Sequence, residues 1–271
     1  MITLCTVILD SVLDYYEIYK KSVATRTKLV SEVFIAKVDS SPYEKTWHQN
    51  GITFHEFGMM CAERSSQGIE HGLGLHACID RAKNVTNDYI MFHDPDVFFY
   101  EPVDKFFYDV MTKHDLNYIG VSHCAAAKFA YTFFPYLSCA LVNKKDLPSA
   151  DWLKGHIRAG GKDSAYGISL DGKYLIRMDN IPECVNFPNP NGDFDTGSML
   201  WLWAHQNSWK WLSFQTVDVH TYTTKFYRGS VKIKENFPMR RLLYHATSST
   251  AGNPVTLKEF EEAWGKSSTD Q

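Results

Sequence analysis

The sequence predicts an α/β fold, with a mostly parallel central sheet and helices on both faces. Apolar, β-branched segments at residues 1–9, 33–38 and 89–93 have the length and composition of buried strands. Between them, residues 12–24 and 72–83 place apolar side chains at helical spacing. Strands that alternate with helices are typical of parallel sheets, whose ligands bind beyond the carboxyl ends of the strands.

The first strand, helix and second strand predict a βαβ unit. We expect Asp10 or Ser11 to cap the helix at residues 12–24, because side chains of this kind accept hydrogen bonds from the free N–H groups of a first turn. The second strand, at residues 33–38, ends at Asp39. Functional residues are therefore expected at Asp10, at Asp39 and after the strand at residues 89–93.

The remaining elements follow from the same patterns. The pair Asn50-Gly51 predicts a turn before a third strand at residues 52–57, and residues 72–83 form a helix with one buried face. Later elements are less regular. We expect strands at 118–121 and 137–142, helices at 146–159, 198–207 and 257–264, and a long loop at 181–195.

The composition is that of an ordinary globular protein. Hydrophobic residues make up 44% of the 271 positions and charged residues 22%, which excludes disordered and fibrous classes. A formal charge of -3 is not that of a nonspecific nucleic-acid binder, so nucleic acid is not an expected partner. One basic segment nevertheless leaves nucleic-acid binding open as an alternative. That segment contains Lys210, Lys225, Arg228, Lys232, Lys234, Arg240 and Arg241.

The cysteines and the chain's hydropathy favour a cytoplasmic protein. The six cysteines form no C-x-x-C pair and mostly stand among apolar residues, as expected for buried, reduced thiols. No signal peptide and no membrane span are predicted. The expectation is a soluble protein of bacterial, phage or viral origin.

The string Asp94-Pro95-Asp96 is the most informative motif. It follows the buried strand at residues 89–93, and alternate residues of an extended chain share one side, so both carboxylates can face one crevice. They repel each other unless a cation lies between them. Mg²⁺ and Mn²⁺ take oxygen ligands and share them with a diphosphate. The competing interpretation is a turn that merely caps the strand.

Five segments that surround this motif resemble the glycosyltransferases of the GT-A fold. They are residues 3–9, 33–39, 72–99, 137–147 and 192–197. The resemblance implies one GT-A-like, Rossmann-type domain over residues 1–271, with a nucleotide-sugar-binding half (1–100) and an acceptor-side half with a C-terminal closing segment (101–271). It also implies a metal-dependent, hexosyltransferase-like enzyme that moves a sugar from a UDP- or GDP-sugar to a hydroxyl acceptor.

The resemblance also implies roles for residues of the first half. Asp94 and Asp96 would hold Mn²⁺ or Mg²⁺ and the donor. Asp39 would contact the nucleobase, or else simply cap its strand. His71 and His76 flank the start of a helix, whose N-terminal amides favour anions, so either is a candidate contact to a phosphate. Ordinary helix histidines are the alternative.

A late histidine is the implied third metal ligand. The candidates are His220 and His245, and we favour His245 because a hydroxyl- and glycine-containing segment follows it, similar to the family's mobile closing segment. A neutral imidazole is an acceptable ligand for Mn²⁺. A buried histidine that serves only packing remains the alternative for both.

Catalysis needs a neutralised leaving group and an activated acceptor hydroxyl. Arg228 is a candidate for the diphosphate, with Lys232, Arg240 and Arg241 as further cations. Asp193 and Asp195 are the candidate bases of an inverting enzyme, and helix capping is the competing role of Asp195. Whether the enzyme inverts or retains is left open.

Three other functions compete with this one. A nucleotidyltransferase is disfavoured, because residues 10–16 contain no glycine-rich loop for a triphosphate. A glycosyltransferase that acts on modified DNA bases would use the late basic segment and nearby aromatic residues. A non-catalytic carbohydrate-binding protein of the same fold is the third. His76 and His93 also depart from the family's usual Asn and aliphatic residue, which leaves the donor's base and sugar open.

Overall fold

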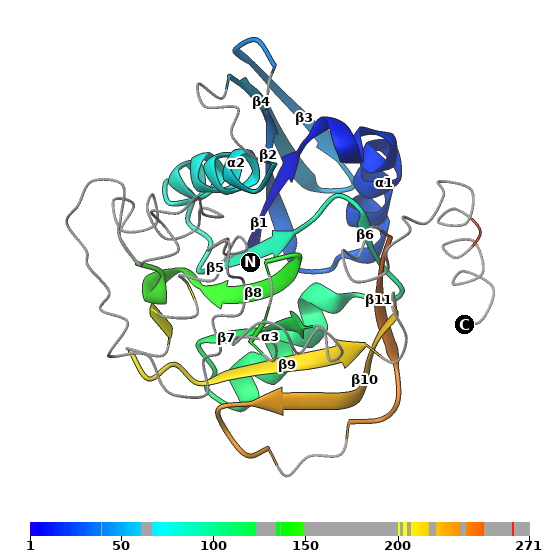
Figure 1. Cartoon of the computed structure of the whole chain (residues 1–271), viewed down its shortest axis with the longest axis vertical. Helices are drawn as coiled ribbons and strands as arrows, with labels where there is room; N and C mark the ends of the chain where they lie inside the picture. Colours follow the sequence, from blue (N-terminus) through cyan, green and yellow to red (C-terminus); the bar gives the residue numbers. More distant parts are fainter. Residues whose placement is uncertain are drawn as a thin grey trace, which may run out of the picture.

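The computed structural model shows an α/β fold built on one mixed sheet (Figure 1). It describes residues 1–38, 40–60, 67–122, 134–135, 137–148, 200, 203–204, 207–216, 221–233, 237–246 and 262. The expected helices at 146–159, 198–207 and 257–264 and the expected loop at 181–195 lie largely or wholly outside these residues.

The predicted βαβ unit is present. Strand β1 (Ile2–Ile8) runs parallel to β2 (Val30–Val38), and α1 (Tyr16–Arg26) connects them. The predicted cap was wrong. A 3₁₀ turn, η1 (Asp10–Tyr15), comes between β1 and α1, so the α-helix begins after the expected cap, and Tyr15 precedes it without a side-chain capping bond.

A hairpin extends the sheet beyond β2. Strand β4 (Ile52–Met59) confirms the predicted third strand and is parallel to β2. Its antiparallel partner, β3 (Tyr43–Gln49), was not predicted. The two central residues of the connecting turn, Asn50 and Gly51, have φ angles of 51° and 80°, as the Asn-Gly pair favours.

The middle of the chain supplies the elements around the aspartates. The predicted helix is α2 (Gln67–Ala82), and the predicted short strand is β5 (Tyr89–His93). Strand β5 pairs in parallel with β1. The elements that follow are β6 (Val97–Phe99), α3 (Val103–Lys113), β7 (Tyr118–Ser122), β8 (Cys139–Asn143), the 3₁₀ turn η2 (Lys144–Asp146), β9 (Trp211–Thr216), β10 (Thr221–Gly229) and β11 (Arg241–His245).

The described strands follow the order β3-β4-β2-β1-β5-β8-β7-β9-β10-β11-β6. The core β4-β2-β1-β5 is parallel, as predicted. From β5 onward most neighbours are antiparallel, with β7 and β9 parallel. This mixed half was not foreseen.

The mixed half of the sheet curls back on itself. Strands β5 and β6 are separated by five strands in the sheet order, yet the chain joins them through residues 94–96 alone. A chain of this length from His93 to Val97 spans at most about 14 Å. The sheet must therefore bend until its last strand returns to β5, which is how late residues reach the D-x-D turn.

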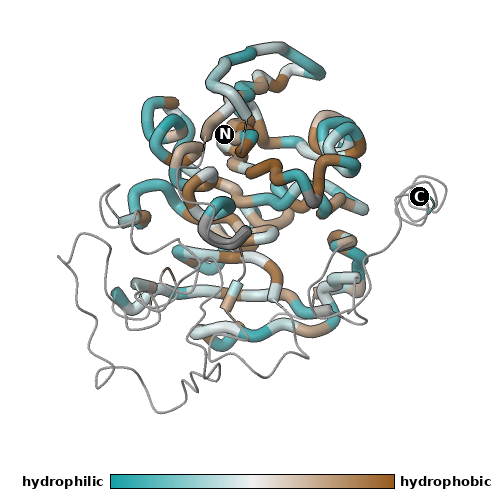
Figure 2. Tube along the Cα trace, turned by 45° about the horizontal axis from the view of Figure 1, so that its top comes forward, coloured by the Kyte–Doolittle hydropathy of each residue, from teal (hydrophilic) through white to brown (hydrophobic). Residues whose placement is uncertain are grey.

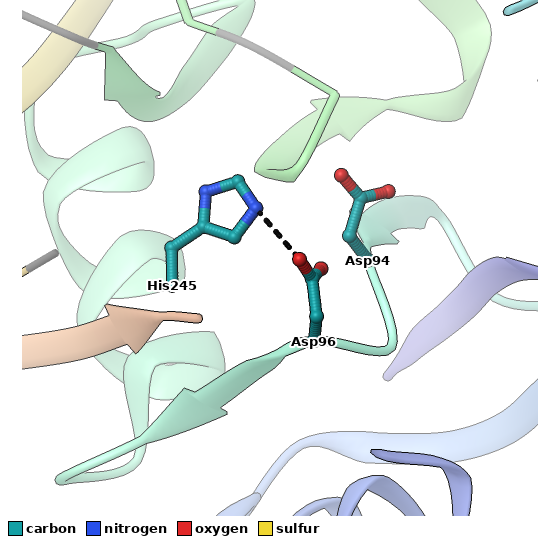
Figure 3. A group of neighbouring side chains, drawn as sticks. All are labelled: Asp94, Asp96 and His245. Carbon is teal, nitrogen blue, oxygen red and sulfur yellow. Dashed lines mark ion pairs between the residues drawn. The ribbon is translucent and has the colours of Figure 1, made fainter. Parts of the chain in front are cut away.

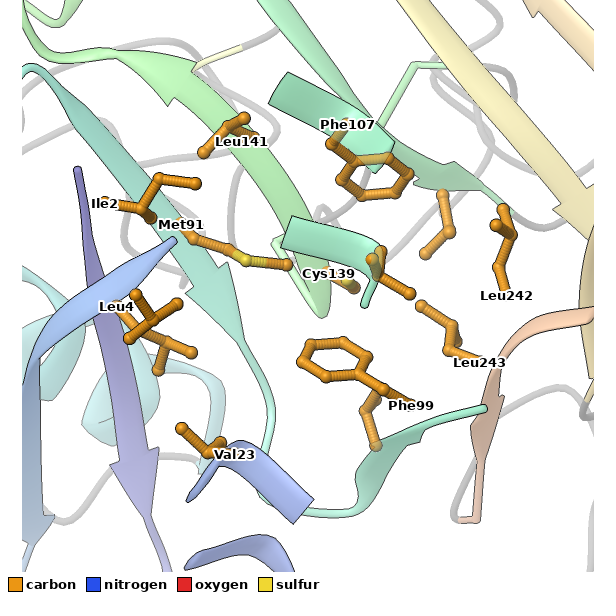
Figure 4. Packing of buried hydrophobic residues seen from close by; sticks show 14 of the residues in the cluster. Ile2, Leu4, Val23, Met91, Phe99, Phe107, Cys139, Leu141, Leu242 and Leu243 are labelled. Atoms are coloured by element: carbon orange, nitrogen blue, oxygen red, sulfur yellow. The ribbon is translucent and has the colours of Figure 1, made fainter. Parts of the chain in front are cut away.

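Two hydrophobic cores hold helices on both faces, as predicted (Figure 2). On one face, Val23 of α1 lies near Leu4 of β1 and Phe107 of α3 lies near Leu141 of β8, all within one cluster of buried side chains (Figure 4). On the other face, α2 packs through side chains such as Cys78 against alternate residues of β1 and β2. The described cysteines Cys5, Cys78 and Cys139 are free and buried. Among the described helices, none is long and apolar enough to cross a membrane.

Candidate functional site

The site begins with a tight turn at the carboxyl end of β5. The N–H of Asp94 donates to the carbonyl of Ser138 (2.9 Å), and the N–H of Val97 donates to the carbonyl of Asp94 (3.1 Å). Pro95 occupies the second position of this four-residue turn, where its fixed φ is favourable. The turn therefore holds Asp94 and Asp96 close together, at the edge of the sheet where ligands of α/β proteins bind.

Pairing between β6 and β11 brings the late histidine to this turn. His245 lies opposite Val97 in the antiparallel register. One residue on, the N–H of Ala246 donates to the carbonyl of Asp96 (2.9 Å). Backbone hydrogen bonds thus fix His245 beside Asp96 without help from a ligand.

Asp94, Asp96 and His245 form a cluster that can hold a metal ion (Figure 3). One ligand atom from each residue lies within 4.8 Å of the others. His245 Nε2 lies 3.2 Å from Asp96 Oδ2. The side chains of Asp96 and His245 are 4% and 10% exposed, whereas that of Asp94 is 24% exposed. The cluster is therefore buried on the Asp96 side and open on the Asp94 side.

The two carboxylates make the cluster attractive to cations. Burial by itself would lower the pKa of His245, but the charge of Asp96, its hydrogen bond to the imidazole and the charge of Asp94 outweigh burial, so the pKa is raised. A metal ion would experience the same attraction, and it would compete with the proton for the imidazole nitrogen.

His71 joins the site, whereas His76 lies elsewhere. His71, on the first turns of α2, places Nε2 3.2 Å from Asp94 Oδ1. His76 is buried and places Nδ1 3.3 Å from Oδ2 of Asp80, on its own helix. The structure therefore separates the two histidines that the sequence left equivalent.

His93, the residue before Asp94, is buried behind the aspartates. It is buried between the rings of Tyr19 and Phe99, whose centroids lie 5.2 Å and 4.4 Å from its own. Among the described residues, neither of its ring nitrogens has a hydrogen-bond partner. Burial lowers the pKa of His93 to about 3, against the opposing charges of Asp94 and Asp96, so this imidazole is neutral at physiological pH.

Tyr15 is a site residue that the sequence analysis missed. It packs with Phe98 and Ala246, which flank the cluster on β6 and after β11. Burial raises the pKa of Tyr15, and the nearby charges of Asp96 and Asp14 raise it further, which places the phenol within the field of the site. Its position after β1, at the same sheet edge as Asp94, was the available signal.

The other predicted residues lie away from the cluster or outside the part of the chain that the structure describes. Arg228 is exposed on β10, seven residues along the chain from Thr221. Thr221 pairs with Tyr244, the residue before His245. At about 3.3 Å per residue that is about 23 Å along the strand, so Arg228 does not belong to the cluster. The predicted residues Asp39, Asp193, Asp195 and His220 lie outside the described residues.

No protein-family model and no curated protein sequence matches the chain. Solved structures match at low identity. S. aureus TarS 1–349 in complex with UDP-GlcNAc is 11% identical, with a TM-score of 0.39, over 59% of this chain and 48% of that one. An active-site mutant of LgtC is 12% identical, with a TM-score of 0.35, over 53% and 57%.

A third match is the glycosyltransferase GlyE of Streptococcus pneumoniae. It is 14% identical, with a TM-score of 0.30, over 53% of this chain and 34% of that one. The chain spans about half the length of the TarS structures. Because every similarity is low, the function proposed below rests on the geometry of this chain's own residues.

Proposed function

We propose that this chain is a metal-dependent glycosyltransferase that moves a sugar from a nucleoside-diphosphate sugar to a hydroxyl group. The observation that carries the proposal is the convergence of Asp94, Asp96 and His245 at the carboxyl edge of a parallel sheet. A structural turn requires neither a buried second acid nor an imidazole brought from the far end of the chain.

The donor atoms of the cluster fit a divalent cation. Two carboxylates and one imidazole match Mn²⁺ well, and the carboxylates alone match Mg²⁺. Asp96 and His245 would hold the ion from the buried side, and Asp94 would hold it from the open side. When bound, such an ion would neutralise the negative charge that builds up on a departing diphosphate.

The residues around the cluster support a phosphate-bearing ligand on the open side of Asp94. His71 approaches Asp94 from α2, near the N-terminal end of the helix, where N–H groups favour anions. We assign His71 to the diphosphate of a UDP- or GDP-sugar. The buried side chains of Tyr15 and His93 limit water on the inner side, which strengthens each electrostatic contact.

We propose that the acceptor binds to the second half of the chain. Residues 1–100 would supply the donor half, and residues 101–271 the acceptor half. In an inverting reaction Asp193 or Asp195 would take the proton of the acceptor hydroxyl. Asp39 would contact the nucleobase at the end of β2.

Thermal unfolding with a panel of UDP- and GDP-sugars, UDP-GlcNAc included, tests the proposal. A donor present at about 100 times its Kd stabilises the native state by about 2.7 kcal/mol. We expect one donor to stabilise the protein with Mn²⁺, and the Asp96→Ala variant to lose most of the metal-dependent part. Asp109→Ala, an exposed carboxylate paired with Lys105, is the matched control and should respond as the parent does.

Hydrolysis distinguishes an enzyme from a binding protein of the same fold. A transferase without acceptor releases its donor's sugar slowly to water, so the stabilising donor should be hydrolysed when Mn²⁺ is present. Stabilisation without hydrolysis would indicate carbohydrate binding alone. Equal stabilisation of the parent and the Asp96→Ala variant by metal and donor would refute the metal site.

A further inference from the structure

Strand β3 lies at one end of the sheet and leaves its outer edge uncovered by any described strand (Figure 1). It is seven residues long, and Glu44, Lys45, Thr46, His48 and Gln49 are exposed, so both of its faces are open. An uncovered edge of this length presents unpaired backbone groups that can pair with another strand. This inference is independent of the proposed function.

The hairpin turn defines which backbone groups face outward. Gln49 and Ile52 close a two-residue turn whose central residues both have positive φ. In such a turn the closing residues are hydrogen-bonded to each other. Because bonded and unbonded pairs alternate along an antiparallel ladder, the N–H and C=O groups of Glu44, Thr46 and His48 point away from β4.

The outward-facing residues are symmetric about Thr46. We propose that β3 pairs antiparallel with β3 of a second copy of this chain, so that Thr46 lies opposite its own copy across a two-fold axis. In this register Glu44 lies opposite His48, and Lys45 lies opposite Trp47. The free groups of Glu44, Thr46 and His48 then bond to those of His48, Thr46 and Glu44 of the copy.

The side chains are complementary on both faces of the joined strands. Glu44 lies on the face that carries α2, where it pairs with Arg81 at 3.3 Å. In the dimer the His48 of the copy would lie opposite it on that face, an acid opposite a base. On the face that carries α1, the ammonium group of Lys45 meets the indole of Trp47. Within one chain the ammonium group of Lys45 already lies 5.2 Å from the centroid of the Trp47 ring, so this indole accepts a cation.

Two of the shifted self-paired registers place like charges opposite each other. Centring the pair on Glu44 places two glutamates opposite each other, and centring it on Lys45 places two lysines opposite each other, which is destabilising. Only the register centred on Thr46 pairs all seven residues of the strand. Charged residues therefore disfavour the registers centred on Glu44 and Lys45, and the length of the strand favours the register centred on Thr46 over the remaining ones.

Sedimentation velocity over a range of concentrations tests the proposal. We expect a dimer in the parent protein and a dissociation constant at least about tenfold higher in Thr46→Pro, because that variant loses the two N–H donors at the centre of the new ladder. Proline is tolerated where the N–H faces solvent on an edge strand, so each chain should still fold, and circular dichroism checks this. Thr46→Val keeps the N–H and should keep the dimer.

Cysteine crosslinking tests the register. Under mild oxidation Thr46→Cys should form a covalent dimer, because it lies opposite its own copy. Glu44→Cys and His48→Cys should each stay uncrosslinked alone, since each is about 14 Å from its own copy, but should crosslink when mixed. The parent protein, oxidised in the same way, is the control for crosslinks formed by its native cysteines. A monomeric parent at all concentrations, a dimer unaffected by a folded Thr46→Pro variant, or equal crosslinking at all three positions would overturn the proposal.

Discussion

The carboxylate of Asp104 is expected to hold the start of β2 against α3, and removing it should destabilise the whole sheet. Asp104 is fully buried in the first turn of α3. Its Oδ2 atom accepts three backbone hydrogen bonds, from Lys28 (2.7 Å), Leu29 (2.5 Å) and Val30 (3.2 Å). These residues turn the chain from α1 into β2, the strand next to β1.

The size of the effect follows from what Asp104→Ala leaves behind. The bond to Val30 is buried, so its N–H would lose its partner without gaining water, at a cost of about 1–3 kcal/mol. The bonds to Lys28 and Leu29 are partly buried, so water would replace part of their contribution. We expect a total loss of about 3 kcal/mol, and about half of that for Asp104→Asn, which keeps one acceptor oxygen without its charge.

Urea unfolding of the parent and the variants measures this loss. Asp109→Ala is the matched control, because Asp109 lies on the same helix but is exposed and paired only with Lys105. Exposed pairs contribute about 0.5 kcal/mol or less. If Asp104→Ala costs no more than Asp109→Ala, the assignment of Asp104 as an anchor for β2 is wrong.

Three further predictions concern the site. His245→Ala should weaken Mn²⁺ binding about 100-fold or more by calorimetry, since one of three ligands is lost, and unchanged affinity would contradict its role. Between pH 8 and pH 5 the parent should lose about 2 kcal/mol of unfolding free energy through His93, and the His93→Phe variant should lack this loss. The folded-state pKa of about 3 keeps His93 neutral, whereas the unfolded chain takes up a proton on this residue below about pH 6.5. An equally steep urea-derived pH profile in His93→Phe would refute this. His71→Ala should weaken nucleoside-diphosphate binding at least about fivefold while leaving binding of the nucleoside unchanged, and equal effects on both ligands would exclude a phosphate contact.

The buried strands could be predicted because a strand that is covered on both faces has a short, continuous apolar sequence. Residues 33–38 and 89–93 are apolar almost throughout, as strands covered on both faces must be. Strand β3 was missed because both of its faces are open, so its polar residues give no alternating pattern. Strand β6 has three residues and forms only because β11 pairs with it.

The site was predictable to the extent that it is local. Asp94 and Asp96 stand two residues apart, and their convergence follows from strand geometry. The position of His245 depends on the register between β6 and β11, which no local pattern contains, so only the family resemblance pointed to it. Tyr15 was missed because it lies in a 3₁₀ turn where a helix was expected.

Because the mixed half of the sheet curls back, the site can form only late in the synthesis of the chain. Among the described strands, β6 pairs with β11 alone, and β11 also carries the imidazole. A ribosome-bound chain that has emerged only as far as residue 240 therefore has both aspartates and β5, but β6 lacks its partner strand and the cluster lacks His245. If the cluster binds Mn²⁺ as proposed, a nascent fragment without His245 would bind the ion more weakly than a chain in which β11 has paired with β6.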